Sequence, residues 1–146
     1  MPRFALAIAV LALGAPLALA ACGGDDDADK PTKAEYIAQA DAICKKGDDQ
    51  IDAEAQKQFG NQAPTEAQVN TFLREVSLPN IEQQRDDLKA LDKPEGDEDE
   101  LDALYESLDK SIETAKNTDG PLDQATFAET NKKAQAYGLK ECGSDD

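Results

Sequence analysis

The chain has 146 residues, with 15 Lys and Arg against 31 Asp and Glu, a formal net charge of −16 and no histidine. Its length fits one domain, and so acidic a chain is repelled by nucleic acid, which is excluded as a partner. The lack of histidine removes the commonest general base and the usual zinc ligands. With no phosphate-binding loop or metalloprotease motif either, we predict no enzymatic activity, catalytic residue, cofactor or metal site.

Residues 1–21 have the layout of a secretory signal peptide, in which Arg3 precedes an apolar run that ends in small residues. The Leu-Ala-Ala-Cys stretch that ends at Cys22 resembles the lipobox of bacterial lipoproteins. The resemblance implies cleavage between Ala21 and Cys22 and a diacylglyceryl group on the Cys22 thiol. We therefore expect a palmitate-type lipid anchor on the outer face of the cytoplasmic membrane, because two acyl chains give stable anchoring.

Two alternatives compete with the lipobox. A transmembrane helix needs roughly 20 apolar residues, whereas a glycine and a proline interrupt this run and acidic residues follow it. Cleavage without lipidation also fits, since residues 18–20 match the small-x-small pattern. The cysteine count favours lipidation, because a lipid on Cys22 leaves two thiols, Cys44 and Cys142, that can pair with each other.

Residues 22–31 are rich in aspartate and contain no apolar side chain large enough to bury. We predict a flexible acidic tether that lifts the folded domain off the membrane. A calcium site is the alternative, because carboxylates are ligands for hard cations. The folded domain is predicted to span residues 32–142, and residues 143–146 are expected to form a frayed tail.

The domain is predicted to be all-α, an antiparallel four-helix bundle, because apolar residues recur at spacings of three and four. Thr32 and Glu35 form a capping-box pattern that begins helix 1, and Gly60 ends it. Gly47 lies on the buried stripe of this helix. Its missing side chain is expected to let a neighbouring helix approach closely.

Helix 2 is expected to begin near Pro64 and to kink or break near Pro79, which removes a backbone donor and clashes with the preceding turn. An acidic loop over residues 92–100 follows, and its oxygen ligands do not fall at EF-hand positions. The most regular apolar period then predicts helix 3. Its members are Leu101, Leu104, Tyr105, Leu108, Ile112 and Ala115.

Helix 4 is predicted from Leu122 to Tyr137, although its apolar stripe is weaker. Gly138 is expected to supply a left-handed cap, with Leu139 packing back onto the helix as in a Schellman motif.

We predict a disulfide between Cys44 and Cys142. An exported domain meets an oxidising compartment, and helix 4 of such a bundle lies beside helix 1. Because Cys44 lies roughly 16 Å beyond Lys33 along the axis, the pairing predicts that the first turns of helix 1 overhang the bundle. Two free thiols or a redox pair are the alternatives, but no C-x-x-C motif or basic cluster activates either cysteine.

Three stretches together resemble small actinobacterial lipoproteins of unassigned function. They are the lipobox with Cys22-Gly23-Gly24-Asp25, the segment from Tyr36 to Cys44 (YIAQADAIC), and the segment from Tyr137 to Gly143 (YGLKECG). The resemblance implies an exported all-helical domain whose two remaining cysteines are paired. It implies no activity.

Our leading hypothesis for function is a lipid-anchored helical binding or scaffold module of the cell envelope, with an unknown envelope protein as partner. The alternative is a solute-binding lipoprotein that holds a small ligand between its helices. Asp41, Arg74, Arg85 and Tyr105 are candidate contributors to such a site, but the sequence does not assign any of them to it. A low-affinity cation-binding surface and a passive spacer are the remaining hypotheses.

Overall fold

The computed structural model describes residues 30–143; residues 1–29, which carry the predicted signal peptide, Cys22 and most of the tether, and residues 144–146 lie outside the described part. Residues 30–143 form helices and connecting turns without any strand, which confirms the predicted all-α class. The elements are α1 (Lys33–Phe59), α2 (Glu66–Phe72), a π-helical turn (Leu73–Ser77), α3 (Leu78–Lys89), α4 (Glu98–Asn117), a 3₁₀ turn (Gln124–Phe127) and α5 (Ala128–Tyr137).

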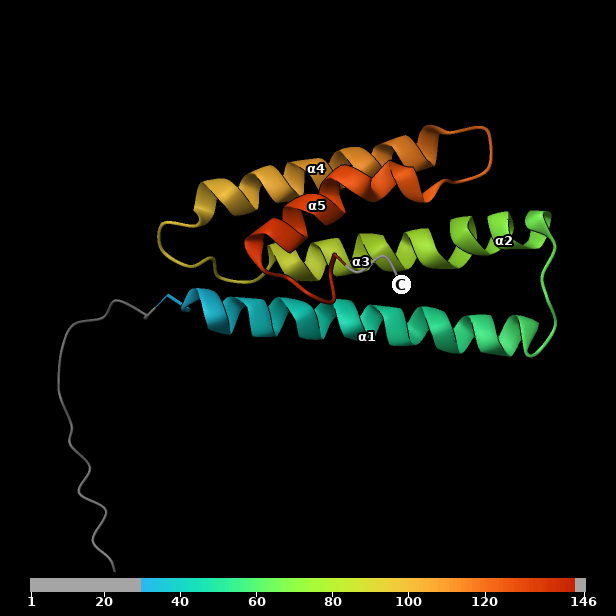
Figure 1. Cartoon of the computed structure of the whole chain (residues 1–146), viewed down its shortest axis with the longest axis horizontal. Coiled ribbons are helices and arrows are strands. Elements are labelled where there is room, and N and C mark those ends of the chain that lie inside the picture. Colours follow the sequence, from blue (N-terminus) through green and yellow to red (C-terminus); the bar gives the residue numbers. More distant parts are fainter. Residues whose placement is uncertain (1–29, 144–146) are drawn as a thin grey trace, which may run out of the picture.

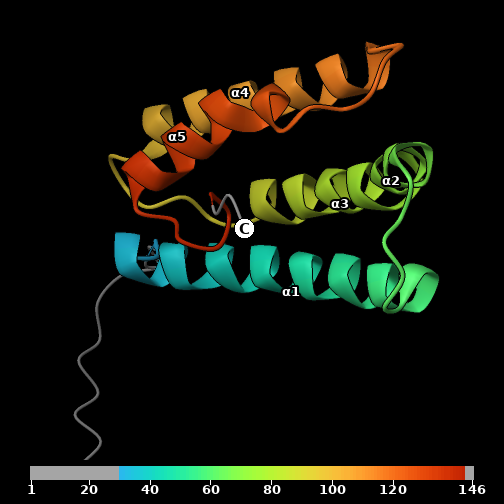
Figure 2. The ribbon, with the colours of Figure 1, turned by 45° about the vertical axis from the view of Figure 1, so that its right-hand side comes forward.

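The helices form a bundle in which α1 contacts α3, α3 contacts α4, and α4 contacts α5. Figures 1 and 2 show α1 on one side, α2 and α3 in the middle, and α4 with α5 on the other side. The larger core cluster joins the first half of α1 to α4 and to the end of α5. Its most deeply buried members are Tyr36, Ala40, Leu101 and Ala134.

The first turn of α1 is capped and packed. Thr32 and Glu35 make the predicted capping box. One turn later, Tyr36 is only 1% exposed and meets the ring of Tyr137 edge to face at 5.8 Å. The hydroxyl of Tyr36 also bonds to that of Tyr105 on α4. The prediction that this end of helix 1 overhangs the bundle is therefore wrong.

A C-terminal turn, residues 138–142, explains how the two cysteines meet without an overhang. Gly138 adopts the predicted left-handed conformation, and the N–H of Leu139 donates to the carbonyl of Ala134, which completes a Schellman motif. The chain then runs along α1, where one carboxylate oxygen of Asp41 accepts the N–H groups of Lys140 and Glu141 at 2.9 and 3.0 Å.

The disulfide between Cys44 and Cys142 is present, which confirms that prediction. It joins the middle of α1 to the last residues of the described chain, so the C-terminal turn reaches Cys44 and α5 itself need not. The next residue, Gly143, is buried, and its carbonyl accepts a hydrogen bond from the amide of Gln135.

The irregularity predicted near Pro79 takes the form of the π-helical turn just before it. Leu78 donates its N–H to the carbonyl of Leu73, five residues back, and Pro79 lies in the first turn of α3. A single wide turn of this kind interrupts the regular α-helical ladder. The close approach predicted at Gly47 is confirmed, because the Gln84 side chain of α3 occupies the space that a Cβ would need there.

Helix 4 was expected from Leu122, but α5 begins at Ala128 and the residues before it form a turn and one 3₁₀ segment. Side chains from elsewhere bind the backbone of this connection. The guanidinium of Arg74 donates to the carbonyls of Thr118 and Gly120, and Asn70 accepts the N–H of Leu122. These bonds fix the turn, and Asp123 then accepts the N–H of Ala125 with its side chain and that of Thr126 with its carbonyl, which starts the 3₁₀ segment in place of the expected helix.

Reduction of the disulfide should lower the free energy of unfolding by about 4–5 kcal/mol, because a crosslink that closes so long a loop restricts the unfolded chain strongly. Its two cysteines are 98 positions apart. Urea unfolding with and without reductant measures the change. The double variant Cys44→Ala/Cys142→Ala serves as control and should not respond to reductant. An unfolding midpoint that reduction leaves unchanged in the unsubstituted protein would contradict this role.

Candidate functional site

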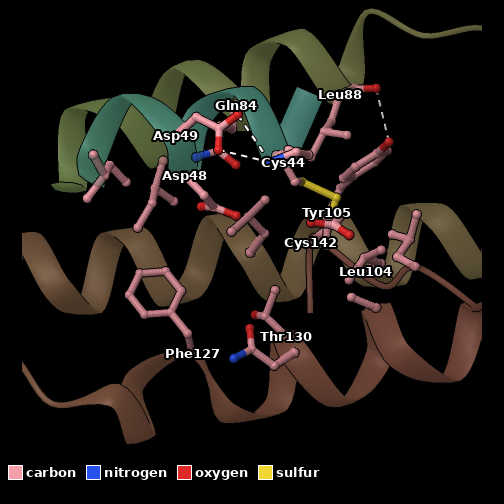
Figure 3. A pocket seen from close by; sticks show the side chains of 18 of the residues that line it. Cys44, Asp48, Asp49, Gln84, Leu88, Leu104, Tyr105, Phe127, Thr130 and Cys142 are labelled. Atoms are coloured by element: carbon pink, nitrogen blue, oxygen red, sulfur yellow. Dashed lines mark hydrogen bonds and ion pairs between the residues drawn. A yellow bond between two sulfur atoms is a disulfide. The ribbon is translucent and has the colours of Figure 1, made fainter. Parts of the chain in front are cut away.

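A cavity of about 530 Å³ lies between α1 and α3 on one side and α4 and α5 on the other (Figure 3). Tyr36 and Tyr137 hold α1 and α5 together at one end, and Figure 2 shows the two helices diverging from there. The disulfide borders the cavity. The apolar wall of the cavity includes Ile51, Ile81, Leu88, Leu104, Leu108 and Phe127.

Acidic side chains of α1 line the same cavity. Asp48 and Asp52 are four residues apart and so lie on one face of α1, and Asp49 and Glu141 line it as well. The ammonium of Lys45 pairs with Asp49 at 2.9 Å. Within residues 30–143, the Asp48 carboxylate makes no hydrogen bond or ion pair.

The pKa of Asp48 is raised above its ordinary value. Burial is the largest cause, and repulsion from Asp52, Glu141 and Asp49 adds to it, while Lys45 acts in the opposite direction. The Asp48 residue is nevertheless exposed at the edge of the cavity, so solvent screens part of this repulsion. A positive charge placed in the cavity would offset this repulsion.

The hydroxyl groups of the cavity are already bonded. The Tyr105 hydroxyl donates to the carbonyl of Leu88 at 3.0 Å and bonds to the Tyr36 hydroxyl, and burial raises the pKa of Tyr105, so it stays neutral. The hydroxyl of Thr130 lies 3.0 Å from that of Ser107 and 3.1 Å from that of Ser111.

Of the four candidate contributors, only Tyr105 lines the cavity. Asp41 binds the C-terminal turn, and Arg74 binds the end of α4 and the turn after it. Arg85 pairs with Asp86 at 2.7 Å and approaches Asp109 at 3.5 Å. These three side chains hold the fold together. The predicted lipidation and cleavage sites at Cys22 and Ala21 lie outside the described residues.

Sequence reasoning missed Asp48, Asp52 and Gln84 as cavity residues. The signal that could have found the two acids is their position beside the buried stripe of α1 that contains Cys44 and Gly47. Because the chain has 31 acidic residues, however, that position alone does not distinguish them.

The described part of the chain contains no group of three or more Asp, Glu, Cys or His side chains placed to hold a metal ion. None of the helices within residues 30–143 combines the length and the apolar character needed to span a bilayer.

No protein-family model, curated protein or solved structure matches the chain. The resemblance to small actinobacterial lipoproteins therefore stays a prediction from three sequence motifs.

Replacing Asp48 with Asn should stabilise the fold at neutral pH. A raised pKa means that the Asp48 carboxyl binds a proton more readily in the folded state than in the unfolded state. The ionised carboxylate therefore lowers the free energy of unfolding at pH values above the raised pKa. This loss disappears as the pH falls below the ordinary pKa of aspartate. Solvent screening limits the expected gain to about 0.5 kcal/mol. Thermal unfolding at pH 7 and at pH 3.5 measures it.

Asp49→Asn is the matched control, because it removes a carboxylate that is paired with Lys45. It should leave stability unchanged or slightly reduced. Equal gains from both substitutions, or a gain from Asp48→Asn that grows as the pH falls, would contradict the raised pKa of Asp48.

Proposed function

We propose that this chain is an extracytoplasmic lipoprotein whose helical domain binds a small molecule in the cavity between α1, α3, α4 and α5. The observation that carries the proposal is the cavity itself. Its volume of about 530 Å³ lies within the range of roughly 300–1,000 Å³ that is usual for small-molecule sites. Such sites combine an apolar wall with a few polar groups, and Leu108 and Asp48 represent these two kinds of lining here.

The cavity favours the solute-binding hypothesis over the scaffold hypothesis, since a sealed core would have offered no room for a ligand. Binding, not catalysis, is the proposed role, because the chain has no histidine and the cavity hydroxyls of Tyr105 and Thr130 bond to other protein groups. The scaffold, cation-buffer and spacer hypotheses have no comparable observation behind them.

The proposed place of action is the outer face of the cytoplasmic membrane, reached through a lipid on Cys22. In support, α1 begins at Lys33, only eleven residues after that cysteine. A fully extended tether over residues 22–31 reaches at most about 35 Å, so the domain would stay close to the lipid surface.

We also propose that the bundle belongs to the antiparallel four-helix class, with α2, the π-helical turn and α3 forming one interrupted arm. The ion pair between Lys116 and Glu82 supports this arrangement, because it joins the end of α4 to the beginning of α3. At the other end of α4, Lys30 pairs with Glu98 just before α1 begins.

The intact mass of the protein extracted from membranes tests the anchor. We expect a chain that begins at Cys22 and carries a diacylglyceryl group, with or without an additional acyl chain on the amine. Cys22→Ser should move the protein from the membrane fraction to the soluble fraction, while Cys44→Ser should not. An unacylated chain, or one cut at another position, would refute the anchor and leave the cavity untouched.

Filling the cavity tests the proposed binding function. Ile51→Trp enlarges a half-buried side chain of the cavity wall, and Val69→Trp makes a comparable change on an exposed part of α2. Thermal unfolding in the presence of a panel of small metabolites should reveal a compound that stabilises the unsubstituted protein and Val69→Trp but not Ile51→Trp. At 100 times its Kd, such a ligand adds about 2.7 kcal/mol. Stabilisation that is the same in all three proteins would count against the cavity as the site.

A further inference from the structure

The two sides of the cavity differ in chemistry. Figure 3 shows Asp48 on the α1 side of the cavity, while Phe127 projects from the opposite side, just before α5. Leu108 of α4 and Ile81 of α3 belong to the apolar lining. A ligand that satisfies both sides needs a polar head and a hydrocarbon body.

The charge of the lining selects the sign of the head. The carboxyl groups of Asp48, Asp49, Asp52 and Glu141 line the cavity, and Lys45 is the only basic side chain among its lining residues within the described chain. Its ammonium is already paired with Asp49. An anion would therefore face repulsion, and a cation would find in Asp48 a carboxylate without an ion pair in the described chain.

The surroundings favour an organic cation over a metal ion. Calcium takes six to eight oxygen ligands, whereas residues 30–143 contain no group of three or more acidic, cysteine or histidine side chains placed to hold a metal. The side chains of Phe127 and Leu108 have no oxygen, nitrogen or sulfur ligand atom for a metal ion. They suit the carbon skeleton of an amine, which keeps its charge at one end.

We infer that the ligand is a small organic cation, a primary or quaternary amine with an apolar body, whose charged head binds at Asp48 and whose body lies against Phe127. This inference rests on the proposed function, since it names the class of molecule that the cavity holds. The neighbouring Asp52 adds attraction for the head from one helical turn away on α1.

Three compounds of one shape and different charge test the inference: 2-phenylethylammonium, 2-phenylethanol and phenylacetate. The full chain is expressed with its N-terminal segment and purified in the form that the cell produces, in lipid nanodiscs if it is membrane-bound. Isothermal titration calorimetry at pH 7 then measures the binding of each compound, with protein-free samples as blanks. We expect the ammonium to bind at least about 10-fold more tightly than the alcohol, which corresponds to about 1.4 kcal/mol, and phenylacetate to bind most weakly.

Asp48→Asn should remove the preference for the ammonium while it keeps the affinity for the alcohol. Asp52→Asn should reduce the preference and serves as a second variant. Asp87→Asn is the matched control, because this carboxylate lies on α3, bonds to Gln83 and does not line the cavity; the preference should survive it. Circular dichroism checks that each variant is folded.

The outcomes separate this inference from the proposed function. The ammonium and the alcohol could bind with equal affinity, and Ile51→Trp could abolish the binding of both. That result would overturn the charge assignment and leave the cavity as a binding site. Failure of 2-phenylethylammonium to bind would overturn the inference. The inference would also be overturned if calcium, added as calcium chloride, bound to the protein, lost its binding in Asp48→Asn and was not displaced by 2-phenylethylammonium.

Discussion

The attachment of the C-terminal turn to α1 is the constraint on which the rest of the structure depends. The disulfide between Cys44 and Cys142 and the carboxylate of Asp41 hold residues 138–142 along α1. Because that turn is continuous with α5, the same attachment fixes where α5 ends. The edge-to-face rings of Tyr36 and Tyr137 then close this end of the bundle.

The cavity follows from that attachment. α1 packs on α3, α3 on α4 and α4 on α5, whereas α1 and α5 meet at the tyrosine end and diverge beyond it (Figure 2). Close packing of a core normally removes such space. Here α1 presents Asp48 and Asp52 beyond Cys44, and neither carboxylate can fill an apolar gap without losing its hydration.

Local chemistry made part of this structure predictable. The capping box at Thr32, the left-handed cap at Gly138 and the close approach at Gly47 each depend on a few neighbouring residues, and each is found in the structure. The cysteine pairing was predicted because two thiols remained in an oxidising compartment. The overhang predicted for helix 1 is absent because residues 139–142 extend along α1 as far as Cys44.

The features that could not be predicted from the sequence depend on tertiary contacts. Leu122 and Phe127 have apolar spacing that suits a helix, but both pack against the cluster of Leu78, Ile112 and Ala115 from a turn and a 3₁₀ segment, and α5 begins later. In the same way, no local pattern separates Asp48 from the other acids. Only the cavity that α3, α4 and α5 form beside it distinguishes Asp48.

The central claim is that α1 and α5, joined at one end, leave a cavity that holds a cationic ligand. A crystal structure of the chain grown with 2-phenylethylammonium tests this claim most directly. The account predicts electron density for the phenyl ring beside Phe127, with the ammonium within hydrogen-bond distance of Asp48. A structure in which Ile51 packs against Leu108 and Phe127 and so closes the cavity would contradict it.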